Sequence, residues 1–227
     1  MPAKIRALLA AVVVLGPVLA ACAGSVDDAA PETRTFGPAD TRLTITKDTG
    51  RLDVRTDDVT EITVTRWLAG DPANVTWERR DNQLTLATDC GLANPCEVRY
   101  EVLVPHDTAL TITGDNGPIT VENITADLDL TSTSGDLRAT GITAAHVRAS
   151  AESGQVELSF AGVPDDVTVT TQNGAVTVTT PPADYRVTTD TDNGEVRNGI
   201  PNDPSSAHVI SVRTDNGAVT LRTAAQS

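Results

Sequence analysis

The stretch VTVTTQNGAVTV, residues 167–178, contains the two features that decide the fold. On both sides of Asn173-Gly174, apolar residues alternate with polar ones, which is the period of a β-strand with one buried face. Asn followed by Gly favours positive φ angles, and therefore a sharp turn between the two alternating segments. The sequence predicts a strand, a tight turn and a second strand, with the valines on the buried face.

The same pattern recurs along the chain. Its other copies are LTITGDNGPITV (110–121), LDLTSTSGDLRA (128–139), VRASAESGQVEL (147–158), VTTDTDNGEVRN (187–198) and ISVRTDNGAVTL (210–221), with an outlying early copy, LTITKDTGRLDV (43–54). The glycines of the six consecutive copies are Gly117, Gly135, Gly154, Gly174, Gly194 and Gly217, spaced 18, 19, 20, 20 and 23 residues apart. Seven residues before its glycine, every one of these copies has Leu, Val or Ile. Such a repeat predicts an all-β fold of stacked units.

Two all-β architectures fit this repeat. In an antiparallel meander, each turn is a hairpin. In a single-stranded β-helix, or β-solenoid, each copy is one rung of about 18–23 residues, and equivalent residues stack in parallel. The even spacing favours the solenoid over residues 110–227, because a meander does not require it. Crossovers between parallel strands are right-handed, so we expect a right-handed coil.

Residues 38–109 form a second region with longer alternating segments. Strands are expected at 60–67, 75–80, 83–88 and 97–104, with a hairpin turn at Asp81-Asn82. The open strand edges at a solenoid end need a cover, so this region is expected to be an N-terminal β cap. Trp67 and Trp77 are interpreted as core or edge-covering residues; the alternative is an exposed pair that lines a sugar site.

Residues 1–21 have the features of a lipoprotein signal peptide. Lys4 and Arg6 precede an apolar run that is too short to span a bilayer as a helix. Leu19-Ala20-Ala21-Cys22 then matches the lipobox of bacterial lipoproteins, which implies a lipid on Cys22 that anchors the chain to the outer side of the cell membrane. The alternative is an ordinary signal peptide with an incidental cysteine. Residues 22–37 are expected to be the lipidated cysteine and a flexible tether.

Charge limits the range of partners. The chain has a net charge of −14, and removal of residues 1–21 leaves 15 basic and 31 acidic residues, a net charge of −16. A surface this acidic argues against nucleic acid, since phosphate neutralisation needs a basic face. It also disfavours close contact with anionic headgroups. Solubility outside the cell is the simplest interpretation of the charge.

Cysteine usage agrees with export. Cys90 and Cys96 remain as a pair once Cys22 is assigned to the lipid, and an oxidising compartment favours a disulfide between them. Closing this loop would contribute about 2.4 kcal/mol on the chain-entropy model. A structural zinc site is the alternative, but it needs four ligands, and the three histidines lie far away in the sequence.

The chain has few residues with the pattern of a catalytic site. His106, His146 and His208 have no motif around them, and neither a Gly-x-Ser-x-Gly sequence nor a phosphate-binding glycine loop occurs. No cofactor is expected. Calcium is the candidate metal for the repeats, because the turns carry oxygen-bearing side chains that stacked rungs would bring together. The candidate ligands are Asp115, Asp190, Asp192 and Asp215.

The repeated [Thr/Ser]-x-[Asn/Ser]-Gly-x-[Val/Leu/Ile] rungs behind a lipobox resemble the bacterial "putative adhesin" family of β-strand-repeat lipoproteins, over residues 40–222. The resemblance implies a right-handed β-helix without catalytic residues. We expect a non-enzymatic cell-surface lipoprotein that presents its solenoid for adhesion or binding to an envelope protein or glycan. The alternatives are a polysaccharide-acting β-helix enzyme and a passive structural protein of the envelope.

Overall fold

The computed structural model describes residues 25–91 and 96–224, so Cys22 lies outside the described residues. The described chain is all-β apart from one short 3-10 helix, η1 (Val26–Asp28). The strands are β1 (Glu32–Pro38), β2 (Arg42–Lys47), β3 (Arg51–Asp57), β4 (Glu61–Ala69), β5 (Asn74–Arg80), β6 (Gln83–Asp89), β7 (Glu97–Pro105), β8 (Ala109–Asn116), β9 (Ile119–Glu122), β10 (Leu128–Ser134), β11 (Leu137–Ile142), β12 (His146–Ser153), β13 (Val156–Phe160), β14 (Asp166–Asn173), β15 (Val176–Thr180), β16 (Arg186–Asn193), β17 (Val196–Asn198), β18 (Val209–Asn216) and β19 (Val219–Thr223). No described helix has the length and apolar character that crossing a membrane requires.

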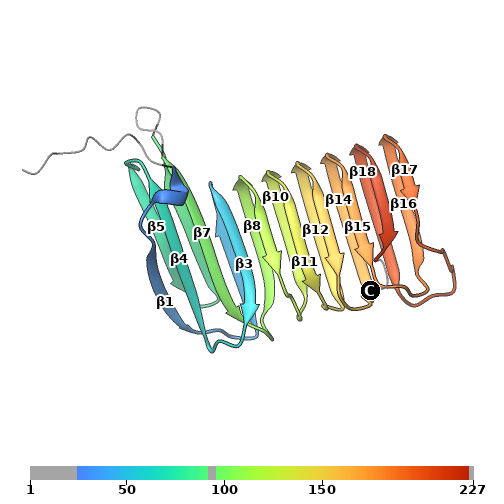
Figure 1. Cartoon of the computed structure of the whole chain (residues 1–227), viewed down its shortest axis with the longest axis horizontal. Helices are drawn as coiled ribbons and strands as arrows, with labels where there is room; N and C mark the ends of the chain where they lie inside the picture. Colours follow the sequence, from blue (N-terminus) through green and yellow to red (C-terminus); the bar gives the residue numbers. More distant parts are fainter. Residues whose placement is uncertain (1–24, 92–95, 225–227) are drawn as a thin grey trace, which may run out of the picture.

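The strands form two stacked sheets (Figure 1). Sheet A has ten strands in the order β1-β4-β7-β3-β9-β11-β13-β15-β19-β17. Sheet B has nine strands in the order β16-β18-β14-β12-β10-β8-β2-β6-β5. Each repeat gives one strand to sheet B, turns at its glycine, and gives the next strand to sheet A. We call this unit a rung and the turn its corner.

Equivalent positions of the rungs stack in register, as the sequence predicts. Leu128 pairs with Val147, and Val147 with Val167, in parallel strands of sheet B. The column continues through Ile210 to Val187. The side chains of the column up to Ile210 are buried between the sheets, together with those that follow the corners in sheet A. The meander is therefore wrong for this region, and the stacked-rung interpretation is confirmed.

The early copy at 43–54 is the first rung of the same stack. β2 pairs in parallel with β8, and β3 pairs in parallel with β9. Residues 58–108, together with β1, extend both sheets beyond this rung. β7 adds to sheet A beside β3, and β4 and β1 follow it as antiparallel strands. β6 adds to sheet B beside β2, and β5 pairs with it across the expected hairpin at Asp81-Asn82.

The last two rungs are not stacked in sequence order. β18 lies between β14 and β16, and β19 lies between β15 and β17. The outermost rung, residues 187–198, therefore comes earlier in the chain than the rung beneath it, residues 210–221. The inward residues explain this order: Val212 and Leu221 are apolar, whereas Thr189 and Asn198 at the matching positions are polar and sit where water reaches them.

The glycine corners allow the rungs to approach closely. A Cβ on Gly154 would lie 2.3 Å from the carbonyl oxygen of Gly135, and a Cβ on Gly174 would lie 1.8 Å from that of Gly154. Gly154 also has a φ of +138°, which L side chains rarely adopt. The same contact recurs from Gly50 to the outermost rung. The repeat therefore requires glycine for two reasons, backbone approach and backbone conformation.

The N-terminal segment differs from the expected tether over 22–37. Residues 32–37 belong to β1, which is hydrogen-bonded to β4, and the side chain of Val26 in η1 is only 7 % exposed. The expectation of a flexible tether is therefore wrong for residues 25–37. Burial of Val26 and the backbone pairing of β1 offset the entropy that a free segment would keep.

Candidate functional site

The outer side of sheet A carries a shallow trough. It consists of two hollows of about 180 Å³ each, which share Thr120. The charged and polar side chains that line this sheet A trough are Arg51, Asp53, Arg55, Arg99, Glu101, Thr120, Glu122, Asp136, Arg138, Gln155, Glu157 and Thr177. They come from five neighbouring rungs and from β7, because alternation along each strand directs every second side chain outward. Thr120 and Thr177 are short, which leaves the hollows between longer neighbours.

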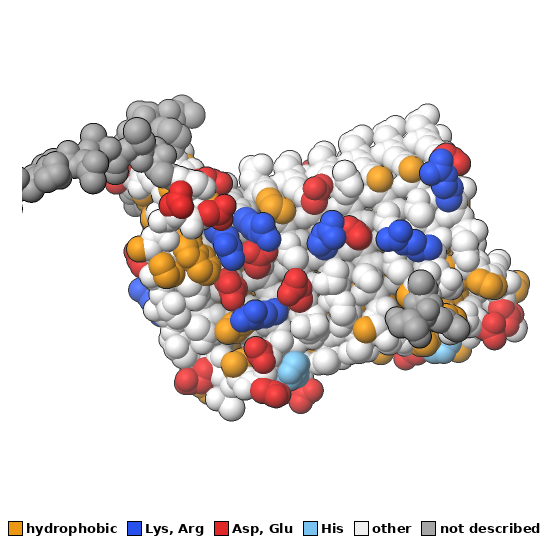
Figure 2. All heavy atoms as spheres, viewed as in Figure 1, with side chains coloured by type: hydrophobic (Ala, Val, Ile, Leu, Met, Phe, Trp, Pro, Cys, Tyr) orange, Lys and Arg blue, Asp and Glu red, His pale blue; other side chains and the backbone are white. Residues whose placement is uncertain are grey.

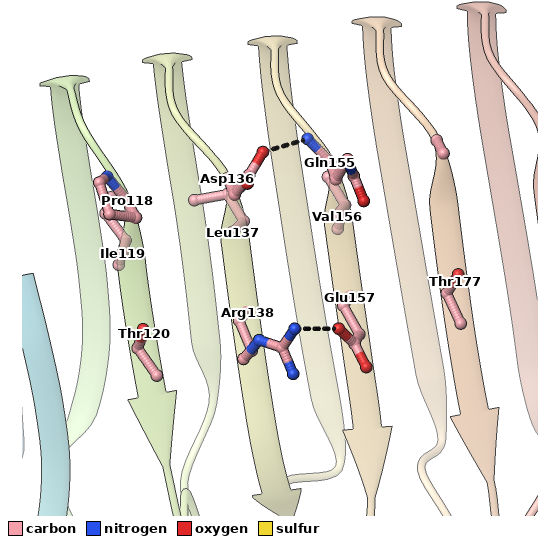
Figure 3. Close-up of a pocket in the computed structure, with 11 residues that line it drawn as sticks. Pro118, Ile119, Thr120, Asp136, Leu137, Arg138, Gln155, Val156, Glu157 and Thr177 are labelled. Atoms are coloured by element: carbon pink, nitrogen blue, oxygen red, sulfur yellow. Dashed lines mark hydrogen bonds and ion pairs between the residues drawn. The ribbon is translucent and has the colours of Figure 1, made fainter.

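Side chains on one half of the trough are held by contacts between adjacent rungs (Figure 3). A guanidinium nitrogen of Arg138 on β11 lies 2.7 Å from a carboxylate oxygen of Glu157 on β13. The carboxylate of Asp136 accepts a hydrogen bond of 2.8 Å from the backbone N–H of Gln155. These contacts fix the spacing of charged groups along the stack.

Arg99 is the centre of the other half. Its guanidinium lies 3.3 Å from Asp53, 3.8 Å from Glu101 and 3.8 Å from Asp27. It also covers the ring of Trp67, at 4.5 Å from the ring centroid. Basic and acidic side chains consequently lie next to one another on this face (Figure 2). The trough presents ordered, alternating charge rather than a field of one sign.

Sheet B has a second, broader hollow of about 520 Å³ on its outer side. Its polar lining residues are Arg42, Thr44, Thr111, Asp127, Asp129, His146, Arg148 and Asp166. The one ion pair among them is that of His146 with Asp127, at 3.1 Å. We regard the sheet A trough as the better candidate, because more of its charged groups are held in place before a partner arrives.

The four calcium candidates do not form one site. Asp190, Asp192 and Asp215 are brought together, but around the guanidinium of Arg213, which pairs with Asp190 and lies 3.7 Å from Asp192 and 3.4 Å from Asp215. Asp115 lies on β8, four strands from β18 and five from β16 in sheet B. Within residues 25–91 and 96–224, no group of three or more His, Cys, Asp or Glu side chains is arranged to hold a metal ion.

The three histidines occupy different rungs at the edge opposite the corners. His106 lies 3.5 Å from Asp58, His146 lies 3.1 Å from Asp127, and His208 lies 3.2 Å from Asp165. Each pair joins neighbouring loops. The structure does not bring the histidines together, and none of them lines the sheet A trough.

Trp77 and Trp67 have separate roles. Trp77 is 9 % exposed and lies under the guanidinium groups of Arg34 and Arg66, each 4.5 Å from its ring centroid. Arg34 also donates a hydrogen bond from β1 to the Trp77 carbonyl on β5, and so joins the edges of the two sheets. Trp67 is half-buried beneath Arg99. The two rings do not form an exposed pair for a sugar.

Sequence reasoning missed Lys47, the one lysine among the described residues. Its side chain is fully buried, and its ammonium group donates to the carbonyl oxygens of Gly50 at 2.6 Å, of Gly117 at 3.0 Å and of Asn116. Burial lowers the pKa of Lys47 to about 8, while Asp48 and Asp115 act in the opposite direction. The sequence contains a signal for this burial. Lys47 is the register partner of Gly114, and the missing side chain of Gly114 leaves room for the methylene groups of the lysine.

Both cysteines of the predicted disulfide are among the described residues. Cys90 and Cys96 form a disulfide in the structure, with Cα atoms 5.2 Å apart. It closes the loop between β6 and β7, and therefore links a strand of sheet B to a strand of sheet A at the N-terminal end of the stack.

Comparison with solved structures finds similar chains at low sequence identity. A "putative cell adhesion protein" from Clostridium sporogenes is 13 % identical, with 87 % of this chain and 100 % of that chain covered and a TM-score of 0.50. A "putative adhesin" from Bacteroides fragilis is 13 % identical, with 86 % and 97 % covered and a TM-score of 0.49. A "putative lipid binding protein" from Parabacteroides distasonis is 14 % identical, with 86 % and 97 % covered and a TM-score of 0.38.

No curated protein matches the chain. The family model described as "Toastrack DUF4097" matches residues 104–222, which include six of the seven rungs in full. The match covers more than half of the chain and confirms the resemblance drawn from the repeated glycine corners. The protein therefore belongs to the Toastrack DUF4097 family.

Proposed function

We propose that this chain is a non-enzymatic lipoprotein, anchored outside the cell by a lipid on Cys22, whose sheet A trough binds a protein of the cell envelope. The observation that carries the proposal is the row of ion pairs along the trough. Arg138 with Glu157 and Arg99 with Asp53 hold opposite charges at a regular strand spacing. A protein surface with complementary charges can pair with them without reorganising the trough.

The chemistry of the trough favours a protein over a neutral glycan. None of the residues that line it is aromatic, and the ring of nearby Trp67 is covered by Arg99. Sugars are commonly bound by stacking on a free aromatic face, whereas ordered charges suit a polypeptide surface. The side chains of the trough pair with one another as salt bridges rather than as a nucleophile with a base, which supports the non-enzymatic assignment.

Two structural details belong to the same proposal. The coil is right-handed, in agreement with the preference of parallel crossovers. Residues 38–109 act as the N-terminal cap, which is supported by the bonds that close this end. Arg34 donates to Trp77 across the two sheets, and Arg79 donates to the carbonyl oxygens of Phe36 and Pro38 at 2.9 and 2.7 Å.

A matched pair of charge reversals tests the binding face. Arg138→Glu changes the outer side of sheet A, and Arg148→Glu makes the same change on the outer side of sheet B, one strand position along the stack. Chain immobilised on beads would be incubated with solubilised envelope proteins at low and high salt. We expect a protein retained by the native chain and by Arg148→Glu at low salt, lost with Arg138→Glu and released by salt.

Equal retention by the two variants would contradict the sheet A assignment. Retention of no envelope protein at any salt concentration would contradict the binding function itself. A third outcome is that purified cell-wall glycan binds in place of protein and that Arg138→Glu abolishes this binding. The trough would then be the binding site, but the proposed class of partner would be wrong.

A further inference from the structure

We propose that the Cys22 lipid holds the N-terminal end of the solenoid directly on the bilayer, so that the edge around Ser25 and loop 70–73 contacts lipid headgroups. The inference rests on the lipid anchor of the proposed function and adds an orientation to it. A long tether would let the body turn freely above the membrane, whereas a short one fixes which end lies at the surface.

The folded body begins at Ser25. The Ser25 side chain accepts a hydrogen bond of 3.3 Å from the backbone N–H of Asp27, which starts η1. Val26 is buried against the sheet, and Asp27 lies 3.8 Å from Arg99 on β7. Because burial of an apolar side chain is favourable, Val26 fastens the start of η1 to sheet A.

Only Ala23 and Gly24 separate Ser25 from Cys22. A residue of extended chain spans at most about 3.3–3.6 Å, so the three steps from Cys22 to Ser25 reach roughly 10 Å. The acyl chains on Cys22 would lie in the hydrocarbon layer, and the interfacial region on each side is several ångströms thick. A reach of this size places Ser25 at the level of the headgroups.

The neighbours of η1 define the contacting edge. Ala69 at the end of β4 pairs with Glu97 at the start of β7, and loop 70–73, whose Gly70, Asp71 and Ala73 are exposed, continues from there. A Cβ on Gly50 would meet the carbonyl of Val98, so this edge is continuous with the glycine corners. Figure 1 shows η1 and the adjoining ends of β4, β5 and β7 at the same edge.

The two tryptophans are natural fluorescent probes of the distance between the N-terminal end of the stack and the membrane. Trp67 on β4 and Trp77 on β5 both belong to the N-terminal end of the stack. At about 4.8 Å per strand, the outermost strand β17 lies eight strand steps, or roughly 38 Å, from β4. Energy transfer from these tryptophans to the membrane surface therefore reports on whether the N-terminal end lies at the bilayer.

The experiment uses the full lipidated chain in phosphatidylcholine vesicles that contain a dansyl-labelled headgroup lipid. One variant carries a Gly/Ser spacer of about 12 residues between Gly24 and Ser25, with a root-mean-square length of roughly 19 Å. The matched control carries the same spacer in the far loop, between Pro204 and Ser205. We expect strong tryptophan-to-dansyl transfer in the native chain and the control, and transfer about twofold or more weaker in the first variant.

Mass analysis of Cys22 separates the two proposals. If Cys22 is lipidated and the native chain and the Gly24–Ser25 variant show equal transfer, the short-spacer orientation is overturned and the anchor stands. If Cys22 carries no lipid, the anchor fails and the orientation fails with it. Weak transfer from a lipidated native chain would also overturn the orientation.

Discussion

Single residues at the corners determine how closely the rungs can stack. Gly154 faces the carbonyl of Gly135 at a distance that no Cβ tolerates, and its φ of +138° is unfavourable for any side chain. Neighbouring corners have the same contact, so the carbonyl of one glycine occupies the place of the missing side chain of the next. The corner glycines are therefore a requirement of packing and are not replaceable by another turn-forming residue.

The Gly154→Ala substitution should destabilise the chain by more than about 2 kcal/mol, since the clash is with backbone and adds to an unfavourable φ. The measurement is the urea midpoint of unfolding. Gly91→Ala is the control, because nothing lies within 4 Å of a Cβ at that position. It should change stability by less than about 0.5 kcal/mol. An equal response of the two variants would show that corner packing does not limit the stack.

Lys47 is a second residue whose chemistry the fold changes. Its folded pKa of about 8 is below the value of 10.5 for a free lysine. Between these two values the unfolded chain binds more protons than the folded chain, so stability must rise as pH increases through this window. Lys47→Met should remove that rise, because a thioether does not titrate.

The comparison to make is the free energy of unfolding of the native chain and of Lys47→Met between pH 7.5 and 9.5, a range of about two units around the folded value. The difference between the two curves should increase with pH in favour of the native chain. In the chain that lacks residues 1–21, Lys47 is the single lysine, so its ε-carbon resonance can be followed without overlap. A midpoint near 10.5 would contradict the buried amine.

At the scale of elements, the two ends of the stack carry different side-chain contacts. The N-terminal end has Trp77 between two arginines, and Arg34 and Arg79 donate to carbonyl oxygens on the opposite edge. The C-terminal end has an outer rung with polar inward residues, and the Asn202 side chain accepts a hydrogen bond of 2.9 Å from the backbone N–H of Val187. Both devices satisfy or cover edge groups that would otherwise pair with another chain.

Trp77→Ala should cost about 3–5 kcal/mol, because it removes a buried aromatic ring and both of its guanidinium contacts. Trp67→Ala should cost less than about 2 kcal/mol, because its ring is half-buried and contacts one guanidinium. Thermal unfolding of the two variants would measure the difference. If Trp67→Ala proved the more damaging, burial of Trp77 between the two arginines would not be the larger contribution to stability at this end.

The sequence predicted most elements but not all of their neighbours. Alternation located the strands of every rung and the hairpin at Asp81-Asn82. It did not locate β1, because ETRTFGP has no regular apolar alternation and its pairing with β4 is made by the backbone. The contact between Arg99 and Asp53 in the trough depends on the pairing of β7 with β3, which joins residues far apart in the chain.

At the scale of the whole molecule, the order of the rungs follows from the polarity of their inward residues. The rung at 187–198 stacks outermost, although its glycine spacing would let it stack directly on the rung before it. The rung at 210–221 has more apolar inward residues and fills the position with neighbours on both sides. The sequence contained this information in Thr189 and Asn198, but even spacing suggested a simple succession.

A reciprocal pair of substitutions tests this explanation. Val212, 1 % exposed, and Thr189 are register partners in the last two rungs. Val212→Thr buries a hydroxyl group and should cost about 1–3 kcal/mol. Thr189→Val lies at the open end and should change stability by less than about 0.5 kcal/mol. Denaturant unfolding of both variants gives the comparison, and similar losses would show that burial does not set the order.

Because every corner is fixed against the next, all variation in repeat length falls on the opposite edge, where loops lead from a sheet A strand back to sheet B. The longest of them, residues 199–208, even lets the chain reverse its stacking order. That edge can accept insertions while the packed strands keep their register. Proteins built on this plan can thus acquire new loops along one side and leave the opposite side unchanged.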